Sequence, residues 1–130
     1  MIPIDQKILH DPEKELIGDC MKACVASVFE IPMNQIPHFA SFNNRGCAFE
    51  YVKFLGQHGY GIYAVHPDKD GEHPKIFPGE CEYYFVIGPS PRFKGATHQC
   101  IGHKGKIIHD PHPDKTGLNE IKYFEILVKL

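Results

Sequence analysis

The chain has 130 residues, 42% of them hydrophobic and 23% charged, with a formal net charge of −2. This size and composition predict a single globular domain over residues 1–130, with enough apolar side chains for a core. Lysine and arginine are neither in excess nor clustered, which argues against nucleic-acid binding. No apolar run approaches the ~20 residues that cross a bilayer, and the N-terminus lacks a signal-peptide pattern. We therefore expect a cytoplasmic protein without a nucleic-acid or membrane partner.

The N-terminal part of the chain predicts an irregular arm and two helices. Residues 1–18 are broken by proline and glycine and form the arm. Asp19 is a favourable N-cap for a helix over 20–30, in which small and apolar side chains recur at helical spacing. Pro32 ends this helix. A second helix, with one apolar side, is expected over 46–57.

The remainder of the chain predicts strands joined by loops. The loops 66–80 and 88–96 are rich in proline, glycine and polar residues, and we expect them to form the walls of a cleft. Two helices followed by a run of antiparallel strands indicate an α+β fold, with N-terminal helices packed on an antiparallel sheet. The strands are expected at 61–65, 81–87, 97–102, 106–110 and 123–130.

The cysteines differ in what their positions suggest. Five is an odd number, so disulfides cannot pair them all, and thiols stay reduced in a cytoplasm. For most of them plain packing is the simplest interpretation, since a free cysteine behaves as a small apolar residue. Cys20 lies in the first turn of its helix, where unpaired N–H groups and the helix dipole favour a thiolate. Cys24 is one turn deeper, where both effects fade, so Cys20 is the expected nucleophile.

A reactive thiol needs a base and a group that orients the base. If residues 103–105 form a three-residue hairpin loop, His98 faces Asp110 on the neighbouring strand. A carboxylate beside an imidazole fixes its tautomer and stabilises its charged form. A two-residue loop would instead set Gln99 against Asp110. The alternative interpretations are a strand histidine bonded to a backbone carbonyl and an aspartate that only shapes a turn.

Two stretches of the sequence carry a resemblance to a known family. They are GDCMKACVASVFEIPMNQIPHF, which begins at Gly18, and HQCIGHKGKIIHDPHP, which begins at His98. Both are similar to small bacterial and phage proteins of the papain-like cysteine peptidase fold, related in outline to C39-type peptidases. The resemblance covers about residues 3–117. It implies that fold, with Cys20 as nucleophile, His98 as general base and acid, and Asp110 as the residue that orients the base.

Further residues are candidates for binding the reaction partner. Papain-like sites resemble one another in an upstream glutamine that forms the oxyanion hole with the backbone N–H of the cysteine. Gln6 is the only glutamine before Cys20, but it lies further upstream than in that family, so a solvated arm residue is the alternative. We assign Asp19, Arg92 and His112 to substrate binding. For Asp19 the alternative is a helix cap, and for the other two it is a solvated surface.

Two other classes of function remain open at this point. One is a catalytically inactive binding or inhibitor protein on the same fold, because a fold alone does not confer activity. The other is a zinc-binding protein, although cysteines inside an apolar helix fit a structural zinc site poorly. The zinc ligands would come from Cys20, Cys24, His98, Cys100, His109 and His112.

The leading expectation is a cysteine-dependent hydrolase or acyl-transferase of the peptidase or amidase type. Cys20 attacks an amide carbonyl and forms a thioester, which water or an amine then resolves. This chemistry needs no cofactor and no metal. The expected partner is a protein, a peptide or a small amide, and the oligomeric state is left open.

Overall fold

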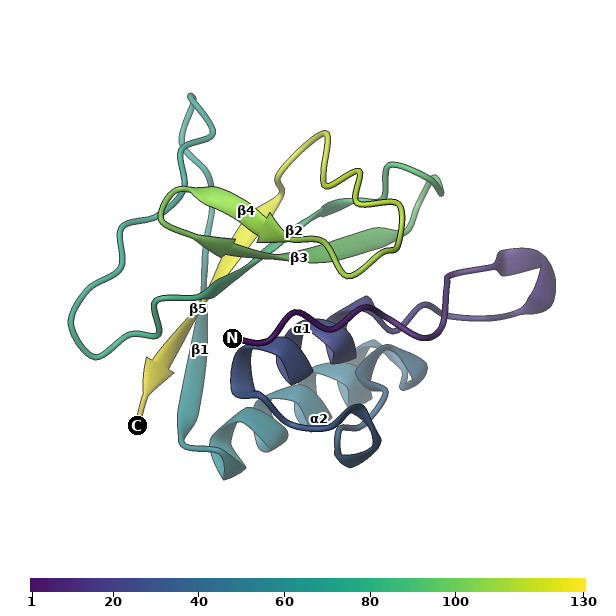
Figure 1. The fold of residues 1–130 in the computed structure, drawn as a ribbon, viewed down its shortest axis with the longest axis horizontal. Helices are drawn as coiled ribbons and strands as arrows, with labels where there is room; N and C mark the ends of the chain where they lie inside the picture. Colours follow the sequence, from purple (N-terminus) through teal and green to yellow (C-terminus); the bar gives the residue numbers. More distant parts are fainter.

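Two helices pack against one face of a five-stranded antiparallel sheet in the computed structural model, which describes all residues, 1–130 (Figure 1). The predicted α+β class is therefore confirmed. No helix has both the length and the apolar character needed to cross a membrane. The helices are α1 (Cys20–Phe29) and α2 (Asn44–Gln57), and the strands are β1 (Tyr60–Val65), β2 (Tyr84–Pro89), β3 (Thr97–His103), β4 (Lys106–His109) and β5 (Tyr123–Lys129).

Helix α1 packs on β3, and its sequence explains how closely the two elements approach. Its buried side chains are small, so its backbone lies near β3. It ends at Glu30, which takes a left-handed conformation with φ of 55°, just before Pro32. Helix α2 begins two residues earlier than predicted, because the Asn43 side chain accepts a hydrogen bond from the Gly46 N–H at 2.7 Å.

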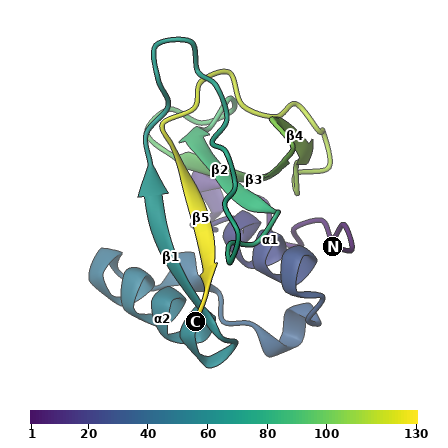
Figure 2. The same cartoon turned by 90° about the vertical axis from the view of Figure 1, so that its left-hand side faces the viewer.

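The sheet has the order β1-β5-β2-β3-β4, which places the C-terminal strand inside it (Figure 2). One face packs on the helices through Phe85, Ile87, Ile101 and Leu127. The other face carries a smaller cluster of Tyr84, Val86, Cys100, Phe124 and Ile126. Loop 66–80 covers this second cluster, with Ile76 packed against it and His73 Nδ1 lying 2.6 Å from the Tyr84 hydroxyl.

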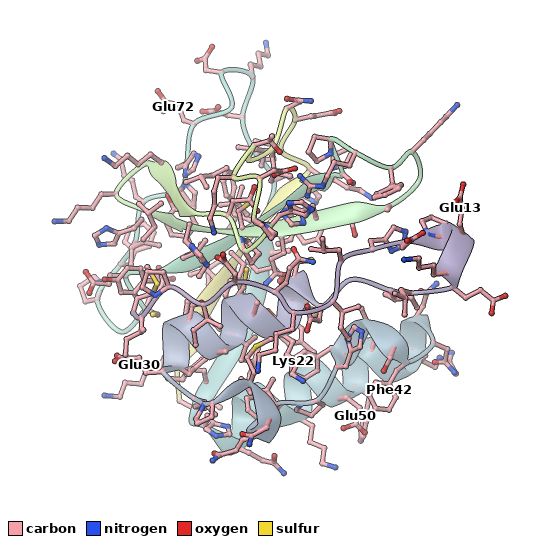
Figure 3. All side chains as sticks on the ribbon, turned by 45° about the vertical axis from the view of Figure 1, so that its right-hand side comes forward. Glu13, Lys22, Glu30, Phe42, Glu50 and Glu72 are labelled. Carbon is pink, nitrogen blue, oxygen red and sulfur yellow. The ribbon has the colours of Figure 1, made fainter.

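The N-terminal arm is bound to the body of the domain along much of its length. Its backbone bonds to Ser27 of α1, and the Gln6 N–H donates to the Pro111 carbonyl at 2.9 Å. The chain then turns back through a short bridge between Asp11 and Leu16. Figure 3 shows Glu13 at the tip of this turn, at the edge of the molecule. The turn returns the chain to the start of α1, so residues far upstream of Cys20 lie beside it.

Candidate functional site

A cleft of about 540 Å³ opens where the arm, the first turns of both helices and the start of β3 meet. Cys20 and His98 line it together. Loop 88–96 forms one wall, as predicted. The expectation for loop 66–80 was wrong, because that loop covers the opposite face of the sheet. The other walls come from the arm, from the short turn at 39–41 and from α2, through Gln6, His10, Ile17, Gly18, Ala40, Asn44 and Cys47.

His98 and Asp110 form a buried pair beside Cys20. His98 Nε2 lies 2.7 Å from Asp110 Oδ1, and the two residues are 4% and 5% exposed. Asp110 also accepts backbone hydrogen bonds from His112 at 2.9 Å and Gly117 at 2.7 Å. Burial opposes the charge on this carboxylate, but these three hydrogen bonds outweigh it and hold the pKa of Asp110 below its usual value.

The pair forms through a different hairpin from the predicted one. The turn has two residues, Lys104 and Gly105, both with positive φ, and His103 pairs with Lys106. The three-residue loop was therefore wrong. A β-bulge between Ile101 and Gly102 then inserts one extra residue on β4, so Ile101 pairs with His109.

The bulge decides which face Asp110 occupies. Without it, the two-residue turn would oppose Gln99 to Asp110 and separate Asp110 from His98. With it, the register continued past His109 sets Asp110 opposite Cys100, on the face that Cys100 shares with His98 two residues earlier. The polar atoms of these three side chains lie within 4.8 Å of one another.

The two cysteines of α1 have different surroundings. Cys20 is the first residue of the helix and is partly exposed in the cleft. Burial alone would lower the pKa of His98, but its interactions with Asp110, Cys100 and Cys20 raise that pKa well above the ordinary value. Cys24 is fully buried, its Sγ lies 3.4 Å from the Gln99 carbonyl, and burial raises the pKa of its thiol. The predicted asymmetry of the pair therefore matches the burial and contacts of the two thiols.

Gln6 lies in the cleft, so the solvated-arm alternative does not describe it. The residue is 7% exposed, and its Nε2 donates to the Ile8 carbonyl at 2.8 Å. That bond uses one of the two Nε2 protons. Its Oε1 is buried without a hydrogen-bond partner.

Asp19 explains how the arm reaches the cleft, and it is not placed to bind a substrate. It occupies the N-cap position of α1, but its side chain makes no cap hydrogen bond. Instead Oδ1 accepts from the backbone N–H groups of Lys7 and Ile8, at 3.0 and 2.9 Å. The residue is 2% exposed. The assignment of Asp19 to substrate binding is therefore corrected: its carboxylate is occupied in fixing the arm that carries Gln6.

Arg92 and His112 both line the cleft, at the end nearest the arm. Arg92 is paired with the Asp114 carboxylate at 3.0 Å and also donates to the Thr116 hydroxyl. His112 accepts a hydrogen bond at Nδ1 from the Asp114 N–H. Burial, with the nearby Arg92 charge, lowers the pKa of His112. Arg92 therefore gives this rim a positive charge that Asp114 partly neutralises, whereas the surroundings of His112 favour its neutral form.

The ligand set of the zinc hypothesis is not assembled. Cys24 faces the Gln99 carbonyl, and His109 Nε2 lies 2.8 Å from the Ile4 carbonyl. The remaining compact group is His98, Cys100 and Asp110. Two ligands on a tetrahedral zinc ion lie about 3.3 Å apart, since each bond is about 2.0–2.1 Å long. The 2.7 Å separation of His98 and Asp110 instead matches a shared proton.

Sequence reasoning missed the inner wall of the cleft. Glu125 on β5 and Gln99 on β3 line it, and Tyr51 of α2 donates a hydrogen bond to Glu125 Oε1 at 3.2 Å. Burial raises the pKa of Glu125 to about 7. The signal was present in the stretch YFEILVKL, where a single carboxylate interrupts an apolar strand.

Comparison of this chain with protein-family models, with curated proteins and with solved structures gave no match.

Proposed function

We propose that this protein is a cysteine-dependent hydrolase or acyl-transferase of papain-like type, acting on an amide bond in a cytoplasm. The observation that carries the proposal is the group at the cleft: a thiol at the tip of a helix, an imidazole beside it, and a buried carboxylate 2.7 Å from that imidazole. Each member comes from a different element, and the three roles of nucleophile, base and orienting group are all filled.

In the first half of the reaction, the Cys20 thiolate attacks the amide carbonyl carbon and a C–S bond forms. The carbonyl oxygen becomes negatively charged and accepts hydrogen bonds from the Cys20 backbone N–H and from the free Nε2 proton of Gln6. His98 is held as an imidazolium by Asp110 and gives a proton to the leaving nitrogen. Because Nε2 is bonded to Asp110, this proton moves at Nδ1. The C–N bond breaks, and an amine and a thioester remain.

In the second half, water or an amine attacks the thioester carbon while neutral His98 takes its proton at Nδ1. The C–S bond breaks, Cys20 leaves as a thiolate, and His98 is again an imidazolium. Protons and charge therefore balance over one turnover. Asp110 keeps its negative charge throughout, because its three hydrogen bonds favour the ionised form.

The nucleophile is tested by alkylation with iodoacetamide at pH 6, followed by intact-mass analysis and peptide mapping. We expect Cys20 to be modified first, because only this thiol combines exposure in the cleft with a charged imidazole. Cys47 provides the matched control, since it is also partly exposed and lines the same cleft. Rapid labelling should be lost in Cys20→Ala and kept in Cys47→Ala. Equal rates for Cys20 and Cys47 would contradict the proposal.

Turnover is tested separately, with a panel of amides and thioesters. Wild type should release product from at least one of them, and Cys20→Ala from none. Selective alkylation without turnover on any member would favour the catalytically inactive binding protein.

A further inference from the structure

Glu125 is a carboxylate on the inner wall of the cleft that the proposed reaction does not use. It lies on β5 and faces the helices, beside the side chains of α2. No other acidic residue lines the cleft. Its only hydrogen bond is the one that Tyr51 donates to Oε1, and no lysine, arginine or histidine pairs with it. A largely buried carboxylate without a cation is energetically unfavourable. Its presence therefore indicates a function rather than a contribution to stability.

The walls around Glu125 are mostly apolar. Met21 of α1, Cys47 of α2, Ile87 of β2 and Tyr123 of β5 line the same cleft. An apolar channel with one carboxylate matches a side chain that has an aliphatic stem and a charged end. Tyr123 also adds an aromatic ring to this lining, a group that attracts a cation placed over its face.

One polar group of this wall has no partner within the protein. Gln99 is 5% exposed, and its Nε2 has no hydrogen-bond partner. Burial raises the pKa of Glu125 to about 7, whereas the Tyr51 hydrogen bond favours the charged form. Near neutral pH a cation that enters the cleft therefore shifts the Glu125 carboxyl group to its charged form at little cost in free energy. Arg92 also lines the cleft, so a cationic group and a carboxylate are both present in it.

We propose that Glu125 forms the end of a subsite for an ammonium or guanidinium group on an aliphatic stem, bound in the cleft that holds Cys20. The chemistry fits a lysine or arginine side chain of a peptide and also a small alkylamine. As a substrate subsite it rests on the function proposed above, whereas as a binding site it stands on Glu125 and its apolar walls alone. Glu125 acts there as a specificity residue and takes no part in bond breaking.

The binding test is an NMR titration with small probes that share one stem. Nα-acetyl-lysine methylamide should bind wild type about tenfold or more tighter than the norleucine analogue, which has the stem without the charge. Glu125→Gln should remove this difference, because it keeps the hydrogen-bonding shape and loses the charge. Glu72→Gln is the control, since it removes the same charge from an exposed loop far from the helices (Figure 3). The Glu125 carboxyl carbon should also titrate at lower pH when the lysine probe is bound.

Other probes separate the sources of the cation. Pentylamine binding as tightly as the lysine probe would identify a free amine as the ligand, and weaker binding would identify a peptide side chain. The glutamine analogue tests a neutral carboxamide. The proposal is overturned if the norleucine or glutamine probe binds as well as lysine, or if Glu125→Gln leaves the preference for lysine unchanged.

A labelling experiment distinguishes this proposal from the catalytic one. Aminohexyl chloroacetamide should alkylate Cys20 about tenfold faster than the neutral hexyl compound, and Glu125→Gln should equalise the two rates. Equal rates in wild type would reject the subsite and leave the nucleophile assignment intact. If Cys20 reacts with neither compound, the catalytic proposal fails, while the titration still decides whether Glu125 binds cations.

Discussion

Replacing Asp110 by asparagine tests the central pair of the candidate site. The carboxylate accepts three hydrogen bonds, from His98 and His112 at Oδ1 and from Gly117 at Oδ2. An asparagine side chain has one acceptor oxygen and one amino group. If its oxygen accepts the hydrogen bonds from His98 and His112, its amide NH2 group faces the Gly117 N–H. Two donors then face each other, and no hydrogen bond forms between them. The substitution therefore conserves volume but breaks the pattern of hydrogen bonds.

The expected cost follows from these contacts. One hydrogen bond to a charged group is lost, which is worth about 1.5–3 kcal/mol. The partly buried Gly117 N–H is also left without a partner, and the His98 imidazolium loses its counter-charge. We expect Asp110→Asn to lower the free energy of unfolding by about 3 kcal/mol at pH 5.5–6.

The pH dependence has a definite sign. The pKa of Asp110 lies below its ordinary 3.8, so its contribution is complete above about pH 4 and is lost as the pH falls. The pKa of His98 lies above its ordinary 6.5, so its contribution is complete below about pH 6.5 and is lost as the pH rises through the folded value. The stability difference between wild type and Asp110→Asn should therefore be largest between about pH 4 and 6.5.

Urea unfolding from pH 3 to 9 measures this difference, and NMR of the His98 ring measures its protonation directly. In wild type the ring should stay protonated above pH 7, whereas in Asp110→Asn the loss of the carboxylate should lower the pKa of His98. Asp114→Asn, in the same loop but at a more exposed carboxylate, should change stability much less. A stability difference that is constant across the pH range, or a His98 ring that titrates alike in both proteins, would refute the reasoning.

Two further substitutions test the oxyanion hole and the hairpin. Gln6→Leu should slow acylation of Cys20 by 4-nitrophenyl acetate by a hundredfold or so, because this step passes through an oxyanion. Alkylation by iodoacetamide has no oxyanion and should keep its rate; a parallel loss of both rates would indicate a structural role instead. Gly102→Ala would place its Cβ 2.3 Å from the Tyr84 ring, so urea unfolding should show a loss of about 2–3 kcal/mol. An unchanged midpoint would exclude the close packing of that glycine on the ring.

The elements that depend on local sequence could be predicted. The predicted bounds of helix α1 agree with the observed ones within one residue at each end, because an N-cap position, a run of small side chains and Pro32 follow one another along the local sequence. The role of Asp19 could not be predicted in the same way. A cap and an anchor for a distant segment require the same residue type, and only the return of the arm decides between them.

The walls of the cleft also could not be predicted from the local sequence alone. Loop 66–80 has a composition typical of a surface loop, and it does lie at the surface, but composition does not say over which face of the sheet. Glu125 is the clearer case. Its place in an apolar strand could have identified it as unusual, although this was missed, whereas its neighbours Tyr51 and Gln99 come from separate elements. A pattern along one strand identifies an unusual residue, whereas its partners depend on how the helices and the sheet pack.

In the hairpin that joins β3 and β4, a turn of a different length from the predicted one and an unpredicted β-bulge together bring His98 and Asp110 into contact. The turn at Lys104 and Gly105 is one residue shorter than predicted, and that alone moves Asp110 to the other face of the sheet. The bulge adds one residue back on β4 and restores the face, so the contact with His98 forms. A bulge leaves no reliable mark in a single sequence. The face of the sheet on which Asp110 lies was therefore not predictable from the sequence. Any insertion or deletion of one residue between His98 and Asp110 should therefore separate the pair.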